Sequence, residues 1–499
     1  MGLNTVDMVV IAVYLAGVTL FGLHFRRKQK TLRSYFLADN LIPWWAISLS
    51  IVAAETSTLT VIGVPGMAYD KDFRFIQLVI GYLVGRILVS GLLVPQYFRG
   101  RLVTAYQLID RRFGGRLRSL TAGMFLLTRA AAEGVRVFAV AIVIRIALGG
   151  LLGRLNDAQR DVTAIAIVTA LTLAYTFEGG MAAVIWTDVV QLTIYVCGTL
   201  AAAYSILHAV PGGWETIHAV AEAAGKFRVF DLSLNPMVTY TLWSGVIGGA
   251  FLTTASHGTD QLIVQRLLAA RSESQAKVAL IASGVAVFFL ISLFLLVGAL
   301  LYVFYRLVAP ATTFSRTDTI FPAYIVTRLP HGLGGLMIAA ILAAAMSNLS
   351  AALNSLSSTT IVDFYARFRP KSSEARRVQL SRTATIGWAA LLFVLALFAR
   401  HGGKVLEMGL SIASVAYGCL LGVFMLGVLT RRASETGAII GMLIGFALNL
   451  YLWRFTAVPY TWYVAAGSIA TYAAGYGASL ITGRGSHRTH PMRAIRIEE

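Results

Sequence analysis

A run of small and oxygen-bearing residues between Ala343 and Ser355 has the composition of a cation site. With 3.6 residues per turn, every third or fourth residue of this run lies on one face of a helix. That face carries Ala344, Ser347, Ser350 or Ala351, and Asn354. Neutral hydroxyl and amide oxygens suit a hard cation such as sodium. The pattern is equally typical of helix packing, because small residues let helices approach and Ser or Asn can hydrogen-bond across.

Two further stretches place polar residues where apolar helix is expected. The first is Ser48–Thr60, followed by the helix breakers Gly63–Gly66, and the second is Thr253–Gln261. A helix broken at membrane depth frees backbone carbonyls, which transporters use to coordinate ions. We therefore predict two discontinuous helices. The alternatives are a helix that is only kinked at Pro65, and an Asp260 that already lies at the inner membrane surface.

Ionisable residues inside apolar segments point to functional sites, since each costs several kcal/mol unless it is paired or faces a cavity. Asp188 is one such residue and requires a cation nearby. Arg129, Glu133 and Arg136 are spaced four and three residues apart, so Glu133 can pair with either arginine on the helix surface. One arginine charge then remains for a solute anion. This excess predicts a carboxylate solute rather than a cation.

The composition shows which elements must position these residues. Of the 499 residues, 57% are hydrophobic and 13% are charged, which excludes a soluble enzyme and a disordered scaffold. The net charge of +19 comes from short basic clusters between apolar segments, so it does not indicate nucleic-acid binding. Cys197 and Cys419 lie inside apolar runs and lack the spacing of a thiolate metal site or a disulfide framework.

The apolar runs predict an all-α, polytopic membrane protein with about 13 spans. The expected spans are 4–24, 41–66, 74–98, 116–150, 162–177, 181–209, 238–258, 276–307, 332–365, 380–399, 406–430, 434–453 and 458–482. The first segment lacks the basic start and cleavage motif of a signal peptide, so we expect it to be retained. The connecting loops are too short for a soluble domain.

The basic residues predict the orientation of the chain. Loops on one side of the predicted membrane hold more than twice as many Lys and Arg residues as loops on the other. Since basic loops stay in the cytoplasm, we expect the N-terminus outside and the C-terminus inside the cell membrane. The segment 483–499 would then be a cytoplasmic tail.

Several motifs together resemble the sodium/solute symporter family, whose members carry sugars, proline, sialic acid, iodide, vitamins and monocarboxylates. The resemblance covers nearly the whole chain. It is carried by the run Gly179–Gln191, the pair Gln265–Arg266, the run Ala343–Ser350, Asp363 and the turn Gly63–Gly66. It implies a LeuT-like core of two inverted five-helix repeats, at about 41–210 and 238–430, within a single domain 1–482. The accessory helices would be 4–24, 434–453 and 458–482.

The resemblance also implies ion sites. The family's sodium site would be formed here by Ala53, Thr56, Ala344, Ser347 and Asn348. Asn348 replaces the usual hydroxyl with an amide oxygen. A second sodium of some members would use Asp188 and Ser350, but Ala351 stands where that site needs another oxygen. We therefore expect a coupling ratio closer to one than to two.

The predicted function is sodium-coupled symport of a small polar organic solute, of the sugar, carboxylate or amino acid class, into the cell by alternating access. Sodium and the solute are the expected ligands, the lipid bilayer is the expected environment, and one protomer should suffice for transport. We expect neither an enzyme activity nor a nucleic-acid partner. Candidate solute contacts are Thr60, Gln77, Arg136, Thr253, Ser256, Ser414 and Tyr417. The alternative is a proton-coupled or uncoupled carrier of the same fold that uses His257 or Glu55.

Overall fold

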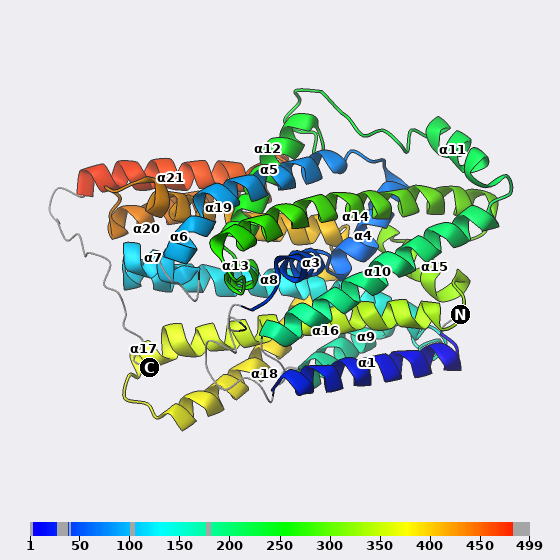
Figure 1. Cartoon of the computed structure of the whole chain (residues 1–499), viewed down its shortest axis with the longest axis horizontal. Helices are drawn as coiled ribbons and strands as arrows, with labels where there is room; N and C mark the ends of the chain where they lie inside the picture. Colours follow the sequence, from blue (N-terminus) through cyan, green and yellow to red (C-terminus); the bar gives the residue numbers. More distant parts are fainter. Residues whose placement is uncertain (1–2, 27–37, 39–40, 100–104, 176–180, 483–499) are drawn as a thin grey trace.

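The computed structural model describes residues 3–26, 38, 41–99, 105–175 and 181–482. Within these ranges the chain is helical and contains no β-strand, which agrees with the predicted all-α class. Most of the longer helices run roughly along the long axis of the molecule (Figure 1).

Most neighbouring helices of the described residues are joined by short connections, and a longer one links α11 to α12. Their bounds are α1 Thr5–Arg26, α3 Trp44–Glu55, α4 Thr58–Asp70, α5 Ile76–Leu92, α6 Val94–Arg99, α7 Tyr106–Arg112, α8 Gly115–Ala147, α9 Asp157–Tyr175, α10 Met181–Ala209, α11 Gly213–Ala223, α12 Leu242–Gly258, α13 Gln261–Leu268, α14 Glu273–Leu307, η2 Thr317–Thr319, α15 Ile320–Arg328, α16 Leu333–Thr359, η3 Thr360–Tyr365, α17 Ala366–Phe368, α18 Glu374–Ala399, α19 Val405–Leu429, α20 Glu435–Phe455, η4 Tyr460–Trp462 and α21 Tyr463–Thr482.

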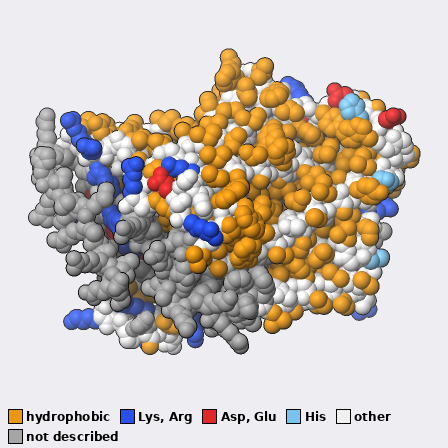
Figure 2. All heavy atoms as spheres, viewed as in Figure 1, with side chains coloured by type: hydrophobic (Ala, Val, Ile, Leu, Met, Phe, Trp, Pro, Cys, Tyr) orange, Lys and Arg blue, Asp and Glu red, His pale blue; other side chains and the backbone are white. Residues whose placement is uncertain are grey.

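Each of the expected spans contains one of these helices, although fewer of them meet a strict test for crossing a membrane. Eight helices of the described residues are long and apolar enough, and the bent pair α3 and α4 would make a ninth. The count of about 13 spans and the division into two repeats therefore stay predictions. Hydrophobic side chains cover most of the described surface in Figure 2, as lipid contact requires.

The first predicted helix break is present within the polar stretch Ser48–Thr60. The chain bends by 64° between α3 and α4, so the break is at Thr56 and Ser57. Pro65 lies inside α4, which continues to Asp70. The turn expected at Gly63–Gly66 is absent, because α4 runs through these residues. A side chain at Gly66 would come within 2.5 Å of the Thr317 carbonyl oxygen.

The second predicted break is present in the polar stretch of the seventh expected span. Helix α12 ends at Gly258 and α13 begins at Gln261. Asp260 caps α13, since its carboxylate accepts a hydrogen bond from the Leu262 amide at 2.9 Å. Helix α12 also packs closely on α5, where a Cβ at Gly81 or Gly85 would lie 2.6 Å from a carbonyl oxygen of α12. Both helix breaks therefore border the same interior region.

Candidate functional site

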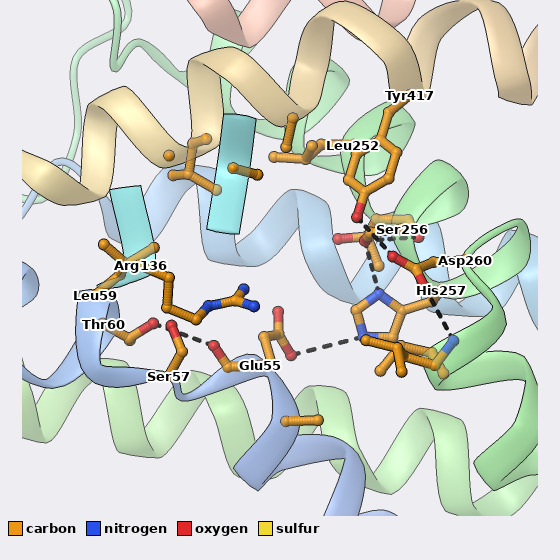
Figure 3. Close-up of a pocket in the computed structure, with 18 of the residues that line it drawn as sticks. Glu55, Ser57, Leu59, Thr60, Arg136, Leu252, Ser256, His257, Asp260 and Tyr417 are labelled. Carbon is orange, nitrogen blue, oxygen red and sulfur yellow. Dashed lines mark hydrogen bonds and ion pairs between the residues drawn. The ribbon is translucent and has the colours of Figure 1, made fainter. Parts of the chain in front are cut away.

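A cavity of about 230 Å³ lies between the α3–α4 break and helices α8, α12 and α19. Its lining combines an apolar body with a few converging polar groups, which is typical of a small-molecule site. Leu59, Leu252 and Leu406 form part of the apolar wall. Figure 3 shows Arg136, Ser57 and Thr60 on one side, Ser256, His257, Asp260 and Tyr417 on the other, and Glu55 between them.

The cavity brings together most of the solute contacts expected from the sequence. The residues that line it are Thr60, Arg136, Thr253, Ser256 and Tyr417. Gln77 is not among the lining residues, because its side chain bonds the carbonyls of Arg74 and Tyr240 and the amide of Asp231. Ser414 is also absent from the lining, since its hydroxyl donates to the Leu410 carbonyl one turn back at 2.7 Å. We assign both a structural role.

The predicted charge ladder on α8 is present and includes one more member. Glu133, with a fully buried side chain, pairs with Arg129 at 2.9 Å and with Arg136 through the same oxygen, Oε1. Asp260 also approaches Arg129, at 3.5 Å, and accepts a hydrogen bond from the Tyr417 hydroxyl at 2.9 Å. Asp260 therefore lines the cavity as a second carboxylate beside Glu133.

Arg136 retains unused hydrogen-bonding capacity inside this ladder. Arg136 and Arg129 pair with the same oxygen of Glu133, so one carboxylate balances two guanidinium groups only in part. Its buried Nε has no hydrogen-bonding partner among the described residues. The side chain is 19% exposed and lines the cavity. A partly exposed guanidinium at a cavity is suited to bind a carboxylate.

A second charged cluster lies at the α3–α4 break. Glu55 forms an ion pair with Arg86 of α5, whose side chain is fully buried. The His257 ring approaches the same carboxylate, with 3.6 Å between Nε2 and Oε2, and lies 3.2 Å from Arg86 Nη2. Arg86 was missed by our sequence analysis. Its signal was available, because a lone arginine inside the apolar segment 76–92 needs a partner at membrane depth.

The α3–α4 break frees the backbone carbonyls that the predicted sodium site requires. In a continuous helix the Ser57 amide would bond the Ala53 carbonyl, but here it bonds Glu55 at 2.9 Å. The Thr60 amide would likewise bond Thr56, and here it bonds Ser57 at 2.8 Å. The two amides that would occupy these carbonyls in a continuous helix therefore bond other residues. This leaves the Ala53 and Thr56 carbonyls available to a cation.

The other half of the predicted sodium site is on α16, which contacts α4. Asn348 lines the cavity, and Ser347 is partly exposed next to it. Ala344 is buried one turn earlier on the same helix. Thr56 at the break and Asn348 on α16 thus line the same cavity, and all the proposed ligating groups are neutral oxygens.

Asp188 has a protein cation as its partner. Its Oδ2 lies 2.9 Å from Arg266 Nη2 of α13 and accepts a hydrogen bond from the Ser50 hydroxyl at 2.5 Å. Ser50 in turn accepts one from Arg266 Nε at 2.8 Å. All three residues are buried. This pairing weakens the case for a second sodium at Asp188 and Ser350, because the charge of Asp188 is already balanced.

Breaking this buried pair should destabilise the protein. Asp188→Asn leaves Arg266 buried without a carboxylate, at a cost of about 3 to 5 kcal/mol. The double variant Asp188→Leu/Arg266→Met removes both charges and should recover most of the lost thermal stability in detergent. Additive losses in the single and double variants would show that the pair does not interact.

Comparison with known proteins identifies the class of this chain. The model of the sodium:solute symporter family matches residues 35–445. The chain therefore belongs to this family of multi-pass membrane transporters, and it is not an enzyme.

Individual relatives agree with this assignment. The chain is 27% identical to the sodium/sialic acid symporter NanT of Aliivibrio fischeri, over 95% of this chain and 92% of that protein. It is 29% identical to the sodium-dependent multivitamin transporter of Oryctolagus cuniculus, over 90% and 70% of the two chains. A solved Na⁺-coupled sialic acid symporter, substrate-bound and outward-open with a novel Na⁺ site, superposes with a TM-score of 0.78 at 27% identity, covering 96% and 98% of the two chains. The predicted LeuT-like fold and sodium as the coupling ion are thereby confirmed.

Proposed function

We propose that this protein carries a small carboxylate solute into the cell together with sodium by alternating access. The observation that carries the solute class is Arg136, which lines the cavity with a partly exposed side chain and shares its carboxylate partner, Glu133, with Arg129. Ser57 lines the same side and offers a hydroxyl donor for the second carboxylate oxygen, whereas the Thr60 hydroxyl beside it donates to the Glu55 carbonyl at 3.1 Å. The apolar wall would accommodate the rest of the solute.

The proposed sodium ligands are the carbonyls of Ala53, Thr56 and Ala344, the Ser347 hydroxyl and the Asn348 side-chain oxygen. Sodium at this point would hold the break of the first helix against α16. Thr56 and Asn348 also line the cavity, so bound sodium would stabilise the shape that the solute requires. The membrane potential would add about 2.3 kcal/mol per 100 mV for each charge carried inward.

We propose one sodium per cycle, since Asp188 is paired with Arg266 and Ala351 supplies no oxygen. The N-terminus would lie outside and the C-terminus in the cytoplasm, and a monomer would suffice for transport. The proton-coupled alternative rests on Glu55 and His257. It is disfavoured because Arg86 stabilises the ionised form of Glu55 and would repel a protonated His257.

A thermal-shift screen of the purified protein tests the proposed class of solute. Carboxylates, sugars, amino acids and vitamins are compared in sodium and in potassium at constant ionic strength. We expect carboxylates to raise the melting temperature in sodium alone. Stabilisation by neutral sugars but by no carboxylate would contradict the assignment of Arg136.

A further inference from the structure

Arginine residues from two distant segments meet where α7 and α8 pack on the connection between α19 and α20. Arg112 donates from Nη2 to the Thr430 carbonyl at 3.1 Å. The Arg116 amide donates to the carboxylate of Glu435, the first residue of α20, at 2.8 Å. Figure 2 shows Lys and Arg side chains at the end of the molecule where Figure 1 places α7 and α20. We name this cluster the arginine corner, and its members are Arg112, Arg116, Arg431 and Arg432.

The positive charge of the arginine corner is not neutralised within the described part of the chain. Arg116, Arg431 and Arg432 are exposed, and their side chains form no ion pair with a described residue. The Arg112 side chain bonds a neutral carbonyl. The Glu435 carboxylate at the corner is engaged through one oxygen by the two backbone amides at the start of α8. The corner therefore carries a local excess of positive charge.

Exposed apolar side chains border the arginine corner. Leu429, two residues before Arg431, is 54% exposed. The Ser434 amide donates to the Ser479 hydroxyl at 3.0 Å, which places the end of α21 beside the start of α20. Ile481, two residues further along α21, is 81% exposed. Cationic groups and apolar side chains thus lie together at the ends of helices that are long and apolar enough to span a membrane.

We propose that the arginine corner binds an anionic phospholipid. Guanidinium groups donate paired hydrogen bonds to phosphate oxygens, and the exposed apolar side chains suit acyl chains. The predicted orientation places the corner at the cytoplasmic leaflet, where basic residues attract anionic lipids. A free phosphate ester would use only the cationic half of this surface. A zwitterionic phospholipid has no net charge to balance the arginines, so it should bind more weakly.

A lipid at this corner would contact both the start of α8 and the connection between α19 and α20. Because such a ligand binds only the folded arrangement of these helices, it should raise the melting temperature of the protein. The inference concerns a surface outside the cavity, so it does not depend on the proposed solute or coupling ion.

Binding of defined lipids to the purified full-length protein in detergent tests this inference. Phosphatidylglycerol and phosphatidylcholine with identical acyl chains are titrated, and binding is followed by native mass spectrometry and thermal shift. We expect phosphatidylglycerol to bind at least tenfold more tightly and to raise the melting temperature more. Arg431→Gln/Arg432→Gln should weaken phosphatidylglycerol binding about tenfold to thirtyfold, because each basic residue near an anionic headgroup adds to the attraction.

Lys371→Gln/Arg376→Gln is the matched control. It removes two exposed cations at the start of α18, which Figure 1 shows on a different side of the molecule from α20. The affinity for phosphatidylglycerol should stay within about twofold of the wild-type value. An equal loss of affinity in this control would overturn the assignment to the arginine corner, as would unchanged binding in Arg431→Gln/Arg432→Gln.

Two further arms distinguish a lipid from other anions and from a folding defect. Glycerol 3-phosphate and inorganic phosphate should stabilise the protein far less than phosphatidylglycerol, and equal stabilisation would overturn the choice of a lipid. Equal affinity for the two phospholipids would overturn the requirement for negative charge. If the double variant does not fold, Arg116→Gln serves instead, since this exposed side chain has no described ion-pair partner. It should weaken phosphatidylglycerol binding about fivefold, and wild-type affinity would contradict the proposal.

Discussion

Ser347→Ala should raise the sodium concentration that half-activates transport by about tenfold to a hundredfold. The variant deprives a desolvated cation of one of about five oxygens, and a hydrogen bond or ligand to a charged group is worth about 1.5 to 3 kcal/mol. Folding should be nearly unaffected, because alanine is the best helix former and Ser347 lies within the continuous helix α16. Initial uptake rates over a sodium titration measure the effect.

Ser350→Ala is the matched control, since it removes the same group one turn further along α16. If one sodium is carried per cycle, the half-activating sodium concentration of Ser350→Ala should stay within about twofold of the wild-type value. Such a change is worth less than about 1 kcal/mol. Ala351→Ser should not raise the Hill coefficient for sodium, because Asp188 is occupied by Arg266. Unaltered sodium dependence in Ser347→Ala would mean that the oxygen-bearing face of α16 serves packing only.

Arg136→Gln should raise the half-saturating solute concentration by about tenfold to a hundredfold with a smaller effect on maximal rate. The variant removes the charge-assisted hydrogen bonds to the solute carboxylate, worth about 1.5 to 3 kcal/mol. Glu133 keeps an ion-pair partner in this variant, because Arg129 still pairs with it at 2.9 Å. Solute titrations at saturating sodium provide the measurement.

Arg145→Gln is the control on the same helix. Arg145 lies near the end of α8 and pairs with Asp157 and Asp161, both at 2.7 Å and away from the cavity lining. Its replacement tests whether loss of any α8 ion pair changes solute affinity. An Arg136→Gln protein with the half-saturation of the wild type would rule out Arg136 as the carboxylate partner.

The local parts of this site could be predicted from the sequence. The spacing of Arg129, Glu133 and Arg136 determines which side chains meet on one helix, so the ladder was predicted correctly. The dense polar stretch before Thr60 marked the first helix break, which lies at Thr56 and Ser57. Gly63–Gly66 do not form the expected turn, since α4 continues through Pro65 and Gly66 lies where η2 approaches closely.

The contacts between distant elements could not be predicted in the same way. Asp188 was expected to need a cation, but nothing in the residue pattern selects Arg266 over sodium. Arg86 and Glu55 are far apart in the chain and meet only because α5 packs against the helix break. Such partners are fixed by the three-dimensional arrangement of helices, which determines where each buried charge is neutralised.

Gradient-driven uptake in proteoliposomes tests the central claim most directly. The purified protein is reconstituted, and a carboxylate found by the thermal-shift screen is supplied outside with an inward gradient of sodium, potassium or protons. We predict that the solute accumulates above its external concentration with the sodium gradient alone, and that an inside-negative potential increases this accumulation. Equal accumulation with a proton gradient, or mere equilibration under all three conditions, would contradict sodium-coupled symport by this protein.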